Sequence, residues 1–162
     1  MKKLLAALLV AGVVQAEDVP IVGNVQSKCV VTTDTAGVYG NPSADELSTA
    51  PADGGKLPIV RYDVASGGAY TAKITTPTSF SSSPTLNDTV AWTGSTEVHE
   101  VSDAAMSDYE ANKVTYAATT EYDLHTAGSA WFKMSSTATY GYGKAFPGGT
   151  YRAVVVAECI AN

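Results

Sequence analysis

The last segment of the chain, residues 148–160, constrains the fold most. It opens with two glycines after Pro147, which is typical of a turn, and then continues with apolar and polar residues in alternation. Val154 and Val156 make the middle of its second face apolar as well, so we predict a β-strand whose centre is covered on both sides. The first face carries Tyr151, Ala153, Val155, Ala157 and Cys159.

The first sixteen residues predict a bacterial secretory signal peptide. Lys2 and Lys3 precede an apolar run, and small residues stand near Ala16, which is the pattern of a cleavage site before Glu17. The apolar run spans about eleven residues, whereas a membrane-spanning helix needs about twenty. We therefore expect an exported protein, secreted or held at the cell surface, with no membrane span in the mature chain.

The chain has two cysteines, Cys29 and Cys159, at opposite ends of the expected mature chain. In an exported protein such a pair favours one disulfide. The chain-entropy account credits a loop of this length with roughly 4–5 kcal/mol. A redox or metal-binding pair would need closer spacing or a neighbouring histidine, and neither cysteine has one.

The composition after the leader predicts an all-β domain over residues 25–162. Threonine, valine and tyrosine recur in short alternating runs, and glycine or proline separates these runs at short intervals. We expect a single antiparallel, immunoglobulin-like β-sandwich of seven to nine strands. Residues 58–64 and 69–76, joined through Gly67 and Gly68, are predicted to form a hairpin. Residues 102–113, with Ser102 as the N-cap, are the one short helix expected.

The charge of the chain argues against two classes of partner. The chain has sixteen acidic residues against ten basic ones, and two of the basic residues lie in the expected leader. An acidic surface repels nucleic acid and anionic lipid, and no stretch of the sequence forms a basic patch. We expect no nucleic-acid partner.

Residues 17–24 predict an extended N-terminal arm that precedes the first strand. The segment is loosely hydrophobic, and Pro20 confines it to an edge or to the start of a strand. Two placements are open: the arm folds back on its own domain, or it lies in a groove on a neighbouring copy by strand addition. The residues expected to share one side are Val19, Ile21, Gly23 and Val25.

No motif in the sequence is typical of a catalytic or metal site. A GxSxG motif is absent, and neither histidine belongs to an HxH or HExxH pattern. Asp103, Asp108 and Glu110 are the best candidates for calcium, but their spacing does not match the twelve-residue calcium loop. A carboxylate pair for glycoside hydrolysis depends on a distance in space, so it leaves no sequence signature. We expect no enzymatic activity, no cofactor and no metal.

The aromatic residues offer two interpretations. The chain has nine tyrosines and two tryptophans, and an exposed row of rings could stack on sugars. Trp92 and Trp131 both lie within strand patterns, where a buried tryptophan between two sheets is common. We favour the core interpretation for both.

The two ends of the chain together resemble a family. The arm residues 19–25, Cys29 soon after them, and the final run of Gly149, Tyr151, Ala153 and Val155 are similar to secreted bacterial fimbrial subunits of the chaperone–usher and spore-coat-U kinds. Such subunits are immunoglobulin-like sandwiches with an N-terminal arm or donor strand. The resemblance implies a pilus-like structural protein that assembles with copies of itself, with a periplasmic chaperone or outer-membrane export factor as a further partner.

The preferred hypothesis is therefore a non-catalytic subunit of an extracellular filament or surface matrix, which assembles through its arm and strand edges. A secreted ligand-binding module for glycans or calcium is the alternative. An exported hydrolase is a third.

Overall fold

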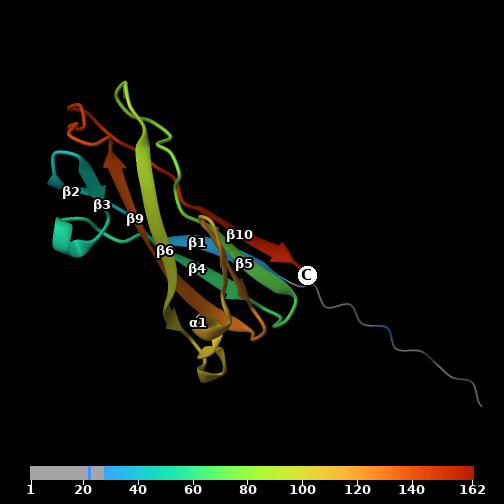
Figure 1. Ribbon diagram of the computed structural model, residues 1–162. Helices are drawn as coiled ribbons and strands as arrows, with labels where there is room; N and C mark the ends of the chain where they lie inside the picture. Colours follow the sequence, from blue (N-terminus) through green and yellow to red (C-terminus); the bar gives the residue numbers. More distant parts are fainter. Residues whose placement is uncertain (1–21, 23–27) are drawn as a thin grey trace, which may run out of the picture.

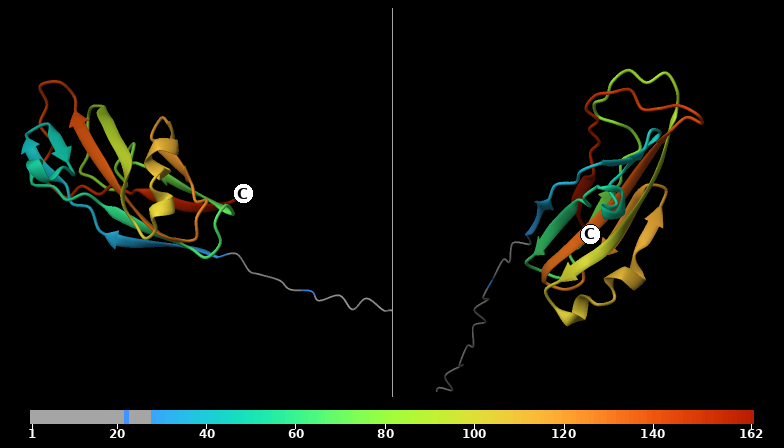
Figure 2. Two further views of the ribbon diagram at one scale, coloured as in Figure 1. Left: turned by 90° about the horizontal axis from the view of Figure 1, so that it is seen from below. Right: turned by 90° about the vertical axis from the view of Figure 1, so that its left-hand side faces the viewer.

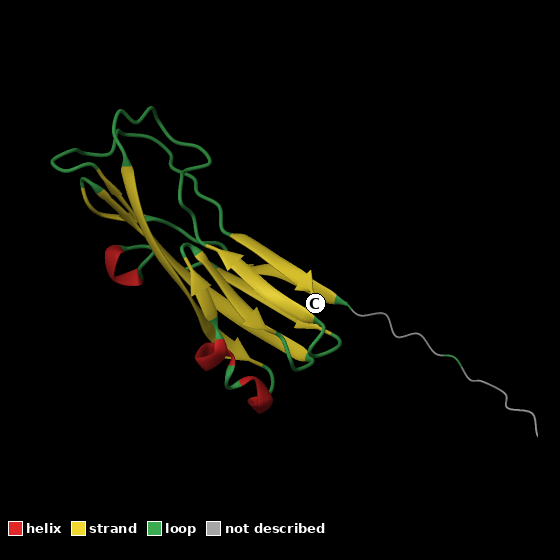
Figure 3. Ribbon diagram, turned by 45° about the vertical axis from the view of Figure 1, so that its right-hand side comes forward, coloured by secondary structure: helices red, strands yellow, loops and turns green. Residues whose placement is uncertain are grey.

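The computed structural model of the protein describes Val22 and residues 28–162, so the leader and nearly all of the predicted arm lie outside the described residues. The described chain forms two antiparallel β-sheets packed face to face (Figures 1 and 3). This confirms the predicted all-β sandwich. The described chain has ten strands rather than seven to nine. Three of them have only three or four residues, which are too few to be recognised as separate strands from an alternating pattern.

The first sheet contains β1 (Cys29–Thr35), β2 (Gly40–Ser43), β3 (Glu46–Ser48), β4 (Ile59–Val64), β6 (Val90–Val101) and β9 (Gly128–Tyr140). Strand β9 is its centre. One edge of β9 pairs with β6, and the other edge pairs with β4 and, further along, with β3. Strand β1 pairs with β4 and forms an edge of this sheet.

The second sheet contains β5 (Tyr70–Thr75), β7 (Val114–Tyr116), β8 (Thr119–Asp123) and β10 (Val156–Ala161), in the order β10-β5-β8-β7. Strand β10 is therefore an edge strand, as β1 is in the first sheet. Figure 1 shows the C-terminus beside the start of β1. We call this the lower end of the sandwich, and the opposite end, formed by loops 76–89 and 141–149, the upper end.

The core lies between the two sheets. Alternate residues of β4, β5, β8 and β9 point inward, as the period of two requires, and their large side chains are almost entirely shielded from solvent. The largest of these are Tyr62, Ile74, Tyr122, Phe132 and Met134. Tyr62 and Phe132 contact edge to face, with ring centroids 5.5 Å apart.

The predicted hairpin over 58–64 and 69–76 is wrong. Strand β4 pairs with β1 and β9 in the first sheet, whereas β5 pairs with β10 and β8 in the second. The glycine-containing connection crosses from one sheet to the other, and the Gly68 N–H donates to the Leu124 carbonyl at 2.8 Å. A hairpin and a crossover present the same alternating runs on either side of a turn.

The predicted helix over 102–113 is only partly correct. This segment contains a 3₁₀ turn, η2 (Ala104–Met106), and a single α-helical turn, α1 (Tyr109–Asn112); a second 3₁₀ turn, η1 (Pro51–Asp53), lies elsewhere. Asp103 rather than Ser102 caps the first turn, accepting a hydrogen bond from the Ala105 N–H at 2.8 Å. Figure 2 shows α1 and β1 on opposite sides of the molecule.

Candidate functional site

A disulfide between Cys29 and Cys159 joins the two edge strands β1 and β10 at the lower end. The prediction of this bond is confirmed. The two Cα atoms are 6.4 Å apart. Because the cysteines lie in different sheets, the bond links the two sheets along one long side of the sandwich, at one point near the lower end.

Above the disulfide, the same side of the sandwich opens into a groove of about 890 Å³. One wall is the upper part of β1 with the segment that follows it, residues 33–39. The other wall is the segment that precedes β10, residues 149–155. Leu47, Val60 and Met134, all buried, lie at the base of the groove. The base is therefore apolar.

The second wall corrects the prediction for the last strand. Only residues from Val156 onward pair in a sheet, although the alternating pattern begins much earlier. Val154 and Val156 are 54% and 47% exposed. The expectation that both faces are covered is wrong, because no part of the described chain packs over the outer face of this segment.

Backbone hydrogen bonds show that this wall has a free edge. Arg152 exchanges hydrogen bonds with Ser82, and Val156 pairs with Thr75. Backbone groups alternate in direction along an extended chain. Those of Ala153 and Val155 therefore point to the opposite edge, and they make no backbone hydrogen bond within the described part of the chain.

The first wall has a free edge too. Strand β1 pairs with β4 along one edge only, and no other described strand pairs with it. The groove therefore combines an apolar base with two strand edges that offer unpaired backbone donors and acceptors. This is the environment that an added β-strand requires.

A cluster of aromatic rings holds the second wall in place. The ring of Phe80 lies 5.1 Å from that of Tyr151 and 4.7 Å from that of Trp92, and Phe146 is 5.1 Å from Tyr151. The Tyr151 hydroxyl also donates to the Pro147 carbonyl at 2.6 Å. The wall is thus fixed by its neighbours at the upper end, although it has no strand partner.

The polar groups of the groove do not form a catalytic arrangement. Tyr39 and Ser136 share a hydrogen bond of 2.8 Å, and burial raises the pKa of the Tyr39 hydroxyl above its usual value. The residues that line the groove include no aspartate, glutamate, histidine or cysteine. The groove can therefore bind an extended apolar segment, but its lining supplies no acid–base pair.

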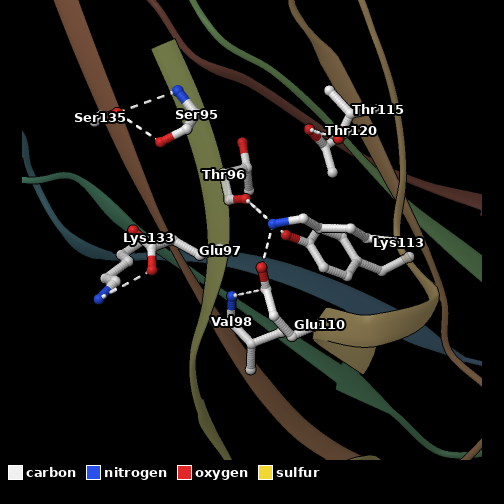
Figure 4. A network of polar contacts seen from close by, with 11 residues as sticks. Ser95, Thr96, Glu97, Val98, Glu110, Lys113, Thr115, Thr120, Lys133 and Ser135 are labelled. Carbon is white, nitrogen blue, oxygen red and sulfur yellow. Dashed lines mark hydrogen bonds and ion pairs between the residues drawn. The ribbon is translucent and has the colours of Figure 1, made fainter. Parts of the chain in front are cut away.

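The opposite long side of the sandwich is closed by polar contacts (Figure 4). The Thr96 carbonyl of β6 accepts hydrogen bonds from the Lys113 ammonium at 3.1 Å and from the Tyr122 hydroxyl at 3.0 Å. Glu110 pairs with Lys113 and accepts from the Val98 N–H at 2.8 Å. Burial raises the pKa of the Tyr122 hydroxyl well above its usual range, so it remains a donor.

The three candidate calcium ligands are each occupied by a different protein partner. Asp103 caps η2, Asp108 pairs with His125 at 3.0 Å, and Glu110 pairs with Lys113. Among the described residues, no group of three or more histidine, cysteine, aspartate and glutamate side chains could hold a metal ion. The candidate ligands do not come together as a site.

The two tryptophans differ from each other. The core interpretation is only partly correct for Trp92, which is half-buried and packs against Phe80 of the 76–89 loop but is not among the buried core residues. Trp131 lies on the outer face of the first sheet, with the Arg61 guanidinium 5.2 Å from its ring centroid, so the core interpretation is wrong for this residue. Arg61 in turn pairs with Asp63 at 2.7 Å.

The arm residues Val19, Ile21, Gly23 and Val25 lie outside the described residues. No prediction from the sequence identified the groove. One feature of the sequence pointed to it: the alternating run in residues 148–160 is longer than the short strand β5, which pairs only with the second half of the run.

Within the described residues, no helix has the length and apolar character needed to cross a bilayer. No protein-family model, curated protein or solved structure matches this chain.

Proposed function

We propose that the protein is a non-catalytic structural subunit of an extracellular bacterial filament or surface matrix, and that the N-terminal arm of one copy fills the groove of another. The observation that carries this proposal is the groove between residues 33–39 and 149–155, with its apolar base and its two unpaired strand edges.

The arm suits this groove in length and in pattern. An extended chain advances about 3.3 Å per residue. Residues 19–25 of the arm and residues 33–39 of the wall therefore both span roughly 20 Å. The alternating arm residues Val19, Ile21 and Val25 would present apolar side chains to the base at Leu47, Val60 and Met134.

The groove also supports the further partner expected from the sequence. A subunit with an apolar groove and free strand edges is prone to aggregate before it assembles. A periplasmic chaperone or an outer-membrane export factor would cover the groove during export, and the arm of another copy would then replace it.

The alternative function, a ligand-binding module, has less support. The candidate calcium ligands are separated and engaged with other partners, and Trp92 is committed to packing with Phe80. Neither feature leaves an evident site for calcium or a sugar.

The experiment compares electron micrographs of the mature protein with those of a variant that lacks residues 17–24. We expect filaments or ordered aggregates from the full protein and single particles from the truncated one. Single particles from both would contradict the proposal.

A matched pair of substitutions tests the groove separately from the arm. Val155 lines the groove, whereas its neighbour Val156 is 47% exposed and does not. We expect Val155→Arg to abolish assembly, because it places a charge against an apolar base, and Val156→Arg to leave assembly unchanged. Circular dichroism and a thermal melt show that both variants fold. Assembly that fails with Val156→Arg alone would point to the outer face instead.

A further inference from the structure

The two outer faces of the sandwich differ in the apolar side chains that they expose. On the second sheet, Val114 and Tyr116 of β7 are 59% and 46% exposed, and Val156 and Ile160 of β10 are 47% and 41% exposed. On the outer face of the first sheet, Val30 is the one large apolar side chain of the described residues with a comparable exposure. Apolar side chains gathered on one exposed face mark an interaction surface.

The strand register arranges the outer face of the second sheet in levels that cross all four strands in the order β10-β5-β8-β7. One level carries apolar and hydroxyl side chains, which are Val156, Thr75, Thr119 and Tyr116. The next level carries charges and ends in an apolar side chain at β7; its members are Glu158, Lys73, Glu121 and Val114. The face therefore has apolar edges and a central pair of opposite charges.

The two central charges are only partly engaged within one copy. The Lys73 ammonium lies 3.8 Å from a carboxylate oxygen of Glu158, whose side chain is 51% exposed. Glu121 accepts a hydrogen bond from the Tyr116 hydroxyl through Oε1, and a carboxylate can accept further hydrogen bonds through its second oxygen. Both groups can therefore take a partner from another molecule.

A second copy complements this face when the two sheets pack face to face around a twofold axis that runs along the strands, between β5 and β8. Packed sheets lie about 10 Å apart with their strands roughly aligned. The axis sets β5 of one copy over β8 of the other, and β10 over β7. Lys73 then lies opposite Glu121 of the second copy, and Val156 lies opposite its Tyr116. Each contact occurs twice, as an isologous interface requires.

Two other twofold arrangements fit less well. An axis across the strands at the charged level places Lys73 opposite Lys73 and Glu121 opposite Glu121, and like charges that face each other repel. An axis between β10 and β5 pairs Lys73 with Glu158 but leaves Val114 and Tyr116 uncovered. Of the three, the axis between β5 and β8 alone pairs the central charges and covers both apolar edges.

We propose that two copies pair through the outer faces of their second sheets, with Lys73 of each copy bound to Glu121 of the other. The contact uses neither the arm nor the groove, so it does not rest on the proposed function. Four strands of about five residues give a flat footprint of roughly 19 Å by 17 Å, well below the roughly 800 Å² that each partner of a stable complex buries. The pair is therefore weak, and many such contacts along an assembly would add together.

Charge reversal followed by mixing tests the ion pair. Lys73→Glu sets two carboxylates against each other at each contact, and Glu121→Lys sets two ammonium groups there, so we expect either variant alone to pair about tenfold more weakly. In an equimolar mixture, the new carboxylate of one variant faces the new ammonium of the other, and the unchanged Lys73 and Glu121 face each other. We expect the mixture to pair as tightly as the parent protein.

Sedimentation velocity at concentrations up to about 1 mM, where a weak pair is populated, measures the pairing. Every sample, the parent included, is the mature protein with Val155→Arg, which removes the proposed groove contact. Arms and grooves are the same in all samples, so association through them cannot depend on mixing. Circular dichroism shows that each variant folds.

Lys133→Glu is the matched control. Lys133 and Glu97 pair on the outer face of the first sheet, and their side chains are 31% and 50% exposed, against 32% and 51% for Lys73 and Glu158. The control changes the net charge as much as Lys73→Glu does, and we expect it to leave pairing unchanged. Val156→Arg should abolish the pair, although it leaves assembly through the arm unchanged.

Three outcomes would overturn the inference. The first is a parent protein that stays monomeric up to about 1 mM, and the second is a mixture that pairs no more tightly than its two components. The third is a loss from Lys133→Glu as large as that from Lys73→Glu, because net charge alone would then explain both. None of these outcomes bears on the role of the arm, which the truncation of residues 17–24 tests separately.

Discussion

The two long sides of the sandwich are closed by different means. On one side β1 and β10 are joined by a covalent bond at the lower end, and above it the walls part into a groove. On the other side, the segment that contains α1 lies against β6 and β8, with Lys113, Glu110 and Tyr122 bonded to the backbone of β6.

The comparison shows that one covalent bond closes less of a side of the sandwich than several hydrogen bonds do. A disulfide acts at one level of the sheet edge, whereas a segment with several hydrogen bonds covers a length of it. The β1/β10 side therefore keeps free strand edges that another chain can use, and the α1 side does not offer such a groove within the described residues.

The largest expected effect is the loss of the disulfide. The bond links residues separated by 130 positions, and the chain-entropy account gives roughly 4–5 kcal/mol for so long a loop. We expect Cys29→Ala with Cys159→Ala to lower the free energy of unfolding by about 4 kcal/mol, measured by urea denaturation. Hydrogen exchange should increase more in β1 and β10, which also open locally once the bond is lost, than in β6.

That result would show that the covalent bond limits local opening of its own side more than that of the α1 side. A loss below about 1 kcal/mol in the free energy of unfolding, or hydrogen exchange that becomes faster by the same factor on both sides, would contradict the view that the disulfide acts mainly on the β1/β10 side.

A smaller effect is expected on the opposite side from Lys113→Met. The substitution removes the ammonium that donates to the buried Thr96 carbonyl, and we expect a loss of about 1 kcal/mol, because a hydrogen bond from a charged donor is worth more than an exposed ion pair. The measurement is again urea denaturation.

Lys133→Met is the matched control for this substitution. Lys133 pairs with Glu97 at 3.5 Å, and its side chain is 31% exposed against 28% for Lys113. Its partner is a half-exposed carboxylate rather than a backbone carbonyl, so we expect a loss under about 0.5 kcal/mol. Equal losses would mean that the contact with β6 does not close the α1 side.

The smallest expected effect has the opposite sign. The Thr96 hydroxyl is buried and has no hydrogen-bond partner among the described residues. Thr96→Val removes this unpaired group and leaves the carbonyl in place, so we expect a gain of up to about 1 kcal/mol in the free energy of unfolding. Thermal and urea denaturation measure it.

Thr120→Val is the control, because Thr120 is equally buried but shares a hydrogen bond of 3.1 Å with Thr115. This variant should lose stability. If Thr96→Val also loses stability, the Thr96 hydroxyl has a partner, and the α1 side is bonded more fully than the contacts described above.

Local patterns predicted some features and not others. The alternation around Cys29 and Cys159 indicated two strands, and a chain with only two cysteines leaves a single possible pairing. The same alternation in residues 58–64 and 69–76 led to a wrong hairpin. Alternation reports that a strand has a buried face, but it does not report which strand lies beside it.

The groove illustrates the same limit. Residues 148–160 carry one continuous alternating run, yet only the part from Val156 onward has a neighbour in its sheet. Whether a strand has a partner depends on the length and position of another segment, here β5, and no property of the run itself contains that information.

The all-β class, the disulfide and the alternating faces could be predicted from the chain, because each follows from residue types and their local spacing. Three features emerge only from the packed structure: β4 and β5 belong to different sheets, one side closes through Lys113 and Glu110, and the other remains open above Cys29 and Cys159. These features depend on distances between segments far apart in the chain, which only the packing of the two sheets sets.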